Sequence, residues 1–267
     1  MSGQSASVSQ SNTQHSIWAH GRITHITTSI GTVYAGWDPE PALESHALPP
    51  LAAWRASNVG NNYVPPSRFN TSDIICHFNA TPGALHVNTF AGDKLQLTWN
   101  QWPVSHVGPV MTYLAACKGS CSQVKKESLE WVKIDELGWL NSTGWDDLML
   151  GGTWASDVLI ANDFTWTVQI PKDLEAGDYV LRHEIIALHV AEGLGGAQAY
   201  PQCVNVRVAK EKSGTKKLEG GVLGTRLYGE RDKGIWVDVH RHIEGYEIPG
   251  PRVWNGAAVV RQPNERA

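Results

Sequence analysis

The chain has 267 residues, of which 42% are hydrophobic and 18% charged, so it is long and apolar enough to bury a sizeable core. Its net charge of −4 at pH 7 excludes the strong basic field that nucleic acid or an anionic membrane would need, and no apolar run approaches the roughly 20 residues of a membrane-spanning helix. The 26 glycines, 14 prolines and 12 tryptophans against three methionines favour a loop-rich, all-β secreted fold over a helical bundle.

The first 19 residues form a polar stretch that ends in the small residue Ala19. This stretch has neither the charged start nor the apolar run of a secretory signal peptide. We expect this leader to be absent from the active form and residues 20–267 to form a single domain.

The next feature is a long proline-rich segment, residues 37–68, which we expect to be functional because long loops in compact domains usually are. Later segments alternate apolar and polar residues with the period of two of half-buried strands. They are residues 94–99, 165–170 and 204–208. The longest strand is expected over residues 179–189, where the odd-numbered side chains share one face.

Helices are expected to be short, with one candidate over residues 124–132. The lysine-rich segment 209–218 is predicted to be a solvated loop. Together these patterns predict a β-sandwich with long decorated loops and short helices.

Four cysteines allow three disulfide pairings. Cys117 and Cys121 bracket a short loop that contains a glycine, so spacing favours their pairing and leaves Cys76 for Cys203. A structural zinc site is the alternative, but such sites usually bring two close cysteine pairs and this chain has one. Three glycosylation sequons also agree with a secreted, extracellular protein: Asn70, Asn79 and Asn141.

Among the eleven histidines, only a convergent set would indicate function. Two strings stand out, WPVSHVGPV at residues 102–110 and LRHEIIALH at residues 181–189, the second followed by GAQAYPQC at residues 196–203. With Ala19-His20-Gly21, they resemble the fungal lytic polysaccharide monooxygenases of auxiliary activity family nine. The resemblance runs from His20 to about Trp254 and includes residues 73–77, 154–157, 224–228, 234–235 and 246–251.

The resemblance implies an immunoglobulin/fibronectin-like β-sandwich with one copper ion per chain at one end. In this family the first mature residue binds copper through its α-amine and its imidazole, and a second histidine supplies the third nitrogen. By motif match these ligands are His20 and His106, with Tyr200 at longer axial range. His189 and Gln198 would lie beside the metal and act in catalysis together with Tyr200. Three nitrogen ligands suit Cu(II), which leads the Irving–Williams order.

The implied activity is oxidative cleavage of a β-1,4-glucan such as cellulose, by hydroxylation at C1 and/or C4 with a reductant and O2 or H2O2. The implied electron donor is a small reductant or cellobiose dehydrogenase, and we expect a monomer. Tyr246 matches a tyrosine that stacks on the glucan chain. The sequence does not decide between C1 and C4 or among β-glucans.

Two alternatives come from other functional classes. One is a non-catalytic carbohydrate-binding protein with the same sandwich, and the other is a copper-binding protein without oxygen chemistry. The copper-binding alternative stays open, although Gln198 and Tyr200 speak against it. The carbohydrate-binding alternative gives no reason for the whole set of site residues to occur together. That set is His20, His106, His189, Gln198 and Tyr200.

The other histidines receive structural predictions. We expect His77 and His183 to be structural. His240 and His242 are two residues apart and would share a face if they lay on a strand. A surface pair is favoured there over a second metal site.

Overall fold

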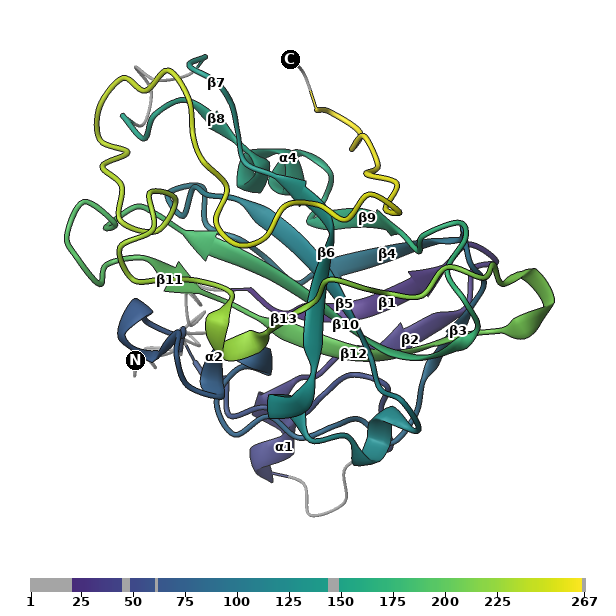
Figure 1. Cartoon of the computed structure of the whole chain (residues 1–267). Helices are drawn as coiled ribbons and strands as arrows, with labels where there is room; N and C mark the ends of the chain where they lie inside the picture. The colour runs from purple at the N-terminus through teal and green to yellow at the C-terminus, as the bar shows by residue number, and fades with distance from the viewer. Residues whose placement is uncertain (1–20, 45–48, 61, 144–148, 266–267) are drawn as a thin grey trace, which may run out of the picture.

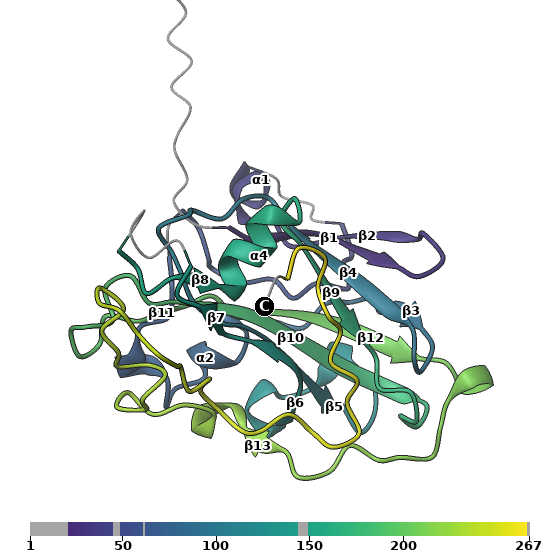
Figure 2. The ribbon, with the colours of Figure 1, turned by 90° about the horizontal axis from the view of Figure 1, so that it is seen from above.

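The computed structural model describes residues 21–44, 49–60, 62–143 and 149–265. Two sheets stack as the layers of a β-sandwich (Figures 1 and 2). The smaller sheet has the order β2 (Val33–Ala35), β1 (Ile23–Thr28), β4 (Lys94–Trp99) and β9 (Thr165–Gln169). The larger sheet has the order β13 (Val222–Leu223), β6 (Glu130–Leu137), β5 (Val110–Ala116), β10 (Gly177–Ala187), β12 (Gln202–Val208) and β3 (Val87–Thr89).

Short elements complete the described chain. Strand β11 (Gln198–Ala199) pairs with the end of β10, and β7 (Trp139–Asn141) pairs with β8 (Thr153–Trp154). The α-helices are α1 (Pro39–Glu44), α2 (Asp73–Cys76) and α4 (Ala155–Ala161). The 3-10 turns are Pro66–Arg68, Cys121–Gln123, Lys126–Ser128, Lys210–Lys212 and Gly224–Arg226. Among the described residues, none of these helices is long and apolar enough to cross a membrane.

One hydrophobic core fills the space between the two sheets. Strand β4 buries every second residue, and its Leu95, Leu97 and Trp99 join this core. The alternation predicted for residues 165–170 is confirmed in β9. In β12, Val204, Val206 and Val208 join the same core, but the polar Asn205 between them is buried as well, where it accepts from the indole of Trp54, so burial does not alternate there. Strand β10 contributes its odd-numbered residues Leu181 and Ile185 to this core. Burial of these side chains is the main stabilisation of a two-layer fold.

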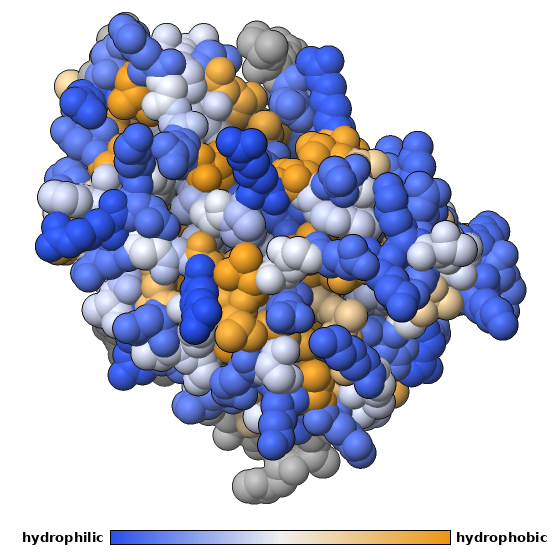
Figure 3. Space-filling view, viewed as in Figure 1, coloured by the Kyte–Doolittle hydropathy of each residue, from blue (hydrophilic) through white to orange (hydrophobic). Residues whose placement is uncertain are grey.

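A second core lies on the outer face of the larger sheet, because long segments cover that face. The even-numbered residues of β10, such as Val180 and Ile186, belong to it. The C-terminal segment, yellow in Figure 1, crosses the sheet here. Hydrophilic residues cover most of this side of the molecule, with small apolar groups between them (Figure 3). Strand β10 is therefore buried on both faces over most of its length.

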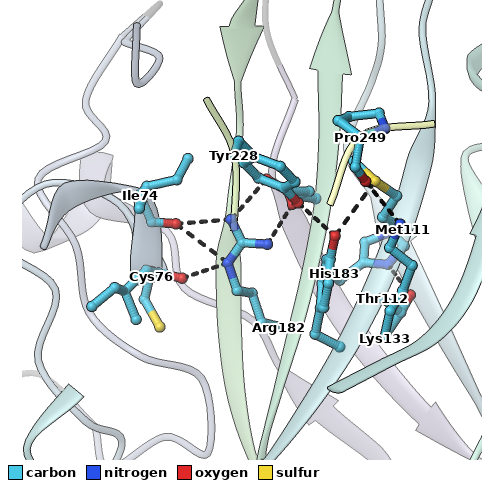
Figure 4. A network of polar contacts seen from close by, with 12 residues as sticks. Ile74, Cys76, Met111, Thr112, Lys133, Arg182, His183, Tyr228 and Pro249 are labelled. Carbon is cyan, nitrogen blue, oxygen red and sulfur yellow. Dashed lines mark hydrogen bonds and ion pairs between the residues drawn. The ribbon is translucent and has the colours of Figure 1, made fainter. Parts of the chain in front are cut away.

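A buried polar network ties these covering segments to the sheet (Figure 4). The guanidinium of Arg182 pairs with the carboxylate of Glu184 and also donates to the carbonyl oxygen of Ile74 in α2, at 2.8 Å. The hydroxyl of Tyr228 donates to Glu184. Both members of the ion pair are fully buried. A charge pair out of water needs such additional hydrogen bonds, so this network fixes how the outer segments dock.

Both predicted disulfides are present, Cys76–Cys203 and Cys117–Cys121. The prediction of a helix over residues 124–132 is wrong. A 3-10 turn occupies Lys126–Ser128, and the chain then enters β6, which pairs with β5. Buried side chains and cross-strand pairing outweigh the local helix propensity there. The strand predicted over residues 179–189 begins and ends two residues earlier, so His189 lies in the turn that follows β10.

Candidate metal centre at one end of the sandwich

The turn after β10 brings Gln198 beside the end of that strand. β11 pairs antiparallel with β10, and the register places Ala187 opposite Gln198. The turn is tight, since a Cβ added to Gly196 would overlap the carbonyl oxygen of Val190. One short stretch of chain therefore carries His189 outward and returns Gln198 to the same end of the sheet.

Tyr200 is anchored from both its backbone and its side chain. Its amide donates to the carbonyl oxygen of Ile185 at 2.9 Å, and its hydroxyl donates to Oε1 of Gln198 at 2.7 Å. The ring is buried and packs edge-on against Trp102 with centroids 5.1 Å apart. Burial raises the pKa of the Tyr200 phenol far above its ordinary value, so the hydroxyl remains a donor to Gln198.

His106 lies in the loop between β4 and β5. Its amide donates to the carbonyl oxygen of Pro103 at 3.0 Å, and its own carbonyl accepts from the indole Nε1 of Trp102 at 2.9 Å. The ring atom Nδ1 lies 3.1 Å from Oγ of Ser105. These contacts orient the imidazole, so Nε2 is the atom that would hold a metal ion.

The loop of His106 is fastened directly to the end of β10. The amide of Leu188 donates to the carbonyl oxygen of Val107 at 2.8 Å. A Cβ on Gly108 would overlap the carbonyl oxygen of Ile186, so only glycine allows the two backbones to approach this closely. This contact brings residues from distant parts of the sequence to one place.

The two imidazoles of His106 and His189 are stacked, with ring centroids 3.9 Å apart and planes inclined by 30°. The Nδ1 atom of His189 is buried and has no hydrogen-bond partner among the described residues. Burial lowers the pKa of His189, which favours its neutral form. Buried polar atoms normally have partners, so this nitrogen indicates that a small polar ligand belongs at the site.

The chain just after His20 also reaches this end of the sandwich. His20 itself lies outside the described residues. The amide of Ile23 donates to Oε1 of Gln202 at 2.7 Å, and Gly21 lines a small pocket together with Gln202 and Tyr200. The residue that follows His20 therefore lies beside Tyr200.

The donors at this end fit a copper ion. Imidazole nitrogen is a preferred ligand of copper, His106 is fixed in orientation, and the orphaned nitrogen of His189 lies on the adjoining ring. Within the described part of the chain, no three side chains of His, Cys, Asp or Glu come together as a metal site. The expected set does not need such a group, because it takes two nitrogens from His20.

Tyr246 lies in the C-terminal segment. Its hydroxyl donates to the carbonyl oxygen of Gly234 at 2.6 Å, and its ring packs edge-on against Trp154 with centroids 4.9 Å apart. The residue as a whole is half-buried, and burial raises the pKa of its phenol well above the ordinary value. Of the three asparagines in glycosylation sequons, Asn70 and Asn79 are exposed, and Asn141 is half-buried.

The structural predictions for two histidines agree with their burial. Burial lowers the pKa of His183 to about 3 and that of His77 to about 4, so both are neutral. Nδ1 of His183 lies 2.8 Å from Oγ1 of Thr112. His240 lies in an irregular segment, not on a strand.

The sequence patterns did not indicate the exposed apolar residues near the site, nor the contact between His240 and the turn after β10. Large apolar side chains are exposed beside the histidines and on the segment that packs against the turn after β10. They are Val104, Val190, Leu194 and Trp236. Nε2 of His240 lies 2.8 Å from the carbonyl oxygen of His189. The GI dipeptide just before Trp236 was the only signal for this segment.

Known proteins resemble this chain over about nine tenths of its length. The model of Auxiliary Activity family 9 (formerly GH61) matches residues 20–246. An AA9 family lytic polysaccharide monooxygenase H from Thermothelomyces thermophilus is 46% identical over 241 residues, which cover 90% of this chain and 67% of that protein. An AA9 family lytic polysaccharide monooxygenase I from Emericella nidulans is 44% identical over 246 residues, 92% of this chain and 65% of its own length. The chain thus spans about two thirds of the length of these curated relatives.

Among solved structures, the extended catalytic domain of H. jecorina LPMO9A is similar to this chain, with a TM-score of 0.84 and 42% identity. The match covers 91% of this chain and 95% of that one. A cellulose-active polysaccharide monooxygenase from M. thermophila has a TM-score of 0.73 and 27% identity, covering 89% of this chain and all of that one.

Proposed function

This chain belongs to Auxiliary Activity family 9, and we propose from that premise that it is a copper-dependent lytic polysaccharide monooxygenase that cleaves a β-1,4-glucan by oxidation. One observation carries the proposal. His106 and His189 stack at 3.9 Å, and the hydroxyl of Tyr200 donates to Gln198 at 2.7 Å at the same end of the sandwich. A carbohydrate-binding protein would not need this arrangement.

One copper ion would be held by His20, through its α-amine and imidazole, and by His106, with the hydroxyl of Tyr200 nearby. The path of the chain supports this assignment, because Gly21 lies beside Tyr200. The active form would begin at His20, since a free α-amine is a good ligand and an amide nitrogen is a poor one near neutral pH. The family match starts at the same residue, which agrees with that form.

Copper bound there would supply one-electron chemistry and the activation of O2 or H2O2, with electrons from a small reductant or a donor enzyme. The residues of the chain determine where this chemistry takes place. The hydroxyl of Tyr200 donates to Oε1 of Gln198 and so leaves the amide Nε2–H groups of Gln198 as donors. These groups and Nδ1 of His189 can hydrogen-bond to a small oxygen-containing reactant and orient it.

The polysaccharide would lie over the exposed apolar side chains beside the site. Sugar rings present C–H faces that pack against aromatic and aliphatic side chains. Trp236 is 45% exposed, while Val104 and Val190 flank the two stacked histidines in sequence. Tyr246 is retained as a substrate contact on the motif match alone, because its ring packs against Trp154 and its hydroxyl bonds to the backbone. Hydroxylation of the C–H bond at C1 or C4 would take one oxygen atom from H2O2, or from O2 with two electrons and two protons, and release water. Elimination from the hydroxylated carbon would then leave a carbonyl group there and release the other sugar as an alcohol, which breaks the glycosidic bond.

We propose that the protein is secreted and monomeric. Two disulfides agree with an oxidising compartment. Asn70 and Asn79 have the exposure that glycosylation requires.

The test is mass spectrometry of soluble products released from cellulose by the protein that begins at His20, with copper and ascorbate present. Oxidised cello-oligosaccharides are expected from this protein, and none from His106→Ala. Binding to cellulose without oxidised products would support a carbohydrate-binding protein and contradict the proposal.

A further inference from the structure

A short part of the C-terminal segment, residues 236–240, holds the turn that carries His189. We call it the strap. The indole Nε1 of Trp236 donates to the carbonyl oxygen of Glu192 at 3.0 Å. The amide of Val237 donates to the carbonyl oxygen of Ala191 at 3.0 Å. Nε2 of His240 lies 2.8 Å from the carbonyl oxygen of His189. Since a carbonyl only accepts, the ring of His240 is the donor.

The strap is itself fixed to the body of the protein. Val239 is fully buried in the outer core, and Ile235 just before the strap is 1% exposed. The amide of His240 donates to Oδ1 of Asp238 at 2.9 Å, which holds the backbone that presents the imidazole. The strap can therefore act as a rigid support for a less constrained neighbour.

The turn after His189 has few hydrogen bonds of its own. The amide of Ala191 donates to the carbonyl oxygen of Leu188, and the amide of Gly196 donates to that of Gly193, both at 2.9 Å. Residues 192–194 are exposed. Within the described part of the chain, the other hydrogen bonds made to residues 189–197 come from the strap, and the bond from His240 is made to the backbone of His189 itself. A carboxylate oxygen of Glu192 also lies 3.7 Å from Nε2 of His240, so His240 contacts the turn at two residues.

We propose that His240 is a positioning residue for His189. Its hydrogen bond to the His189 carbonyl fixes the backbone from which the imidazole of His189 stacks on His106. The role in the reaction rests on the proposed function, but the role in holding the turn does not. Displacement of His189 would leave the copper ligands in place and move a group that orients the oxygen reactant.

Two substitutions at position 240 test the proposal. His240→Ala removes the donor, whereas His240→Gln keeps an amide N–H at nearly the same distance from the backbone. Arg241→Gln is the matched control, because Arg241 is exposed, adjacent and outside the strap. Hydrogen–deuterium exchange of residues 188–197 is measured on the chain that begins at His20, with and without copper. Copper affinity, the Cu(II) spin-resonance spectrum and the yield of oxidised products are then compared.

His240→Ala should exchange several-fold faster over residues 188–197, bind copper as the wild type does, and give several-fold less product. His240→Gln should restore both exchange and yield, and Arg241→Gln should match the wild type. Unchanged exchange in His240→Ala, unchanged yield despite faster exchange, or a glutamine variant that behaves like alanine would overturn the positioning role. If the wild type gives no oxidised product, the proposed function fails, while the exchange data still decide whether His240 holds the turn.

Discussion

The imidazole of His106 lies stacked on that of His189, with centroids 3.9 Å apart, although one residue precedes β5 and the other follows β10. The stacking depends on the backbone contact between Val107 and Leu188 and on the close approach at Gly108. One ring is assigned to the metal and the other to the reactant. The site therefore depends on how two loops of the larger sheet are fastened together.

Copper binding should depend on His106 and not on His189. His106→Ala is expected to lose tight copper binding, because it removes a nitrogen ligand, whereas His189→Ala should bind one copper ion per chain and lose turnover. Titration calorimetry and metal analysis of the purified variants measure this difference. Full copper occupancy in His106→Ala, with an unchanged spin-resonance spectrum, would remove His106 from the ligand set.

Tyr200 and Gln198 should act as a coupled pair. Tyr200→Phe is expected to retain copper but to release the carboxamide of Gln198, since it deletes the 2.7 Å hydrogen bond. The losses of product yield in Tyr200→Phe and Gln198→Ala should then be less than additive in the double variant, as is usual for residues in contact. Independent effects in this cycle would show that Tyr200 does not orient Gln198.

The stability of the fold should carry a pH dependence from Asp135. Burial raises the pKa of this carboxyl from 3.8 to about 7, and its Oδ2 accepts from the indole of Trp166 at 2.8 Å. Between pH 4 and 7 the folded state keeps a proton that the unfolded state has lost, so the contribution of Asp135 to the free energy of unfolding falls as pH rises.

Asp135→Asn should remove this contribution. We expect the change in free energy of unfolding between pH 4 and 7 to be smaller in the variant than in the wild type by about 1–3 kcal/mol. Urea unfolding at several pH values measures it. Identical pH profiles for the two proteins would contradict the raised pKa.

The buried ion pair should be costly to break. Glu184→Gln leaves the guanidinium of Arg182 without its countercharge in a fully buried position. Loss of one partner of such a pair typically destabilises by about 3–5 kcal/mol. Thermal unfolding should show a clear decrease, and a variant as stable as the wild type would mean that this network does not hold the outer segments.

Two aromatic residues should differ in their contribution to substrate binding. Trp236→Ala is expected to weaken binding to cellulose more than Tyr246→Ala does, because Trp236 is more exposed, whereas the Tyr246 ring packs against Trp154. A loss of roughly tenfold for Trp236 corresponds to about 1.4 kcal/mol. Equal binding by Trp236→Ala and the wild type would exclude Trp236 from the substrate face.

The sequence predicts the sandwich strands well because burial alternates along them. Residues 94–99 and 165–170 alternate clearly, and both are strands as expected. The helix predicted over residues 124–132 is wrong, because pairing of β6 with β5 decides the conformation there and local helix propensity does not. The odd-numbered side chains of β10 share one face only as far as Ala187, because the strand ends there and the chain turns.

The site was predictable as a set of motifs but not as a geometry. The strings around His106 and Tyr200 name the residues that the proposal uses, and the structure brings these residues to one end of the sandwich. The stacking of His106 on His189 and the bond from His240 arise between distant segments, and local patterns do not encode such contacts. Trp236 and His240 were missed for the same reason, since they lie in irregular chain that only tertiary contacts place.

The proposed copper site depends most on the α-amine of His20 as a ligand. Its pKa in a free chain is about 7.7–8.0, so it is available near neutral pH, whereas an amide nitrogen is not. The decisive measurement compares Cu(II) affinity and oxidised product yield for a chain verified to begin at His20 and one verified to begin at Ala19. We expect tight binding and full activity only in the chain that begins at His20. Equal copper affinity and equal activity in the two chains would contradict the proposed copper site.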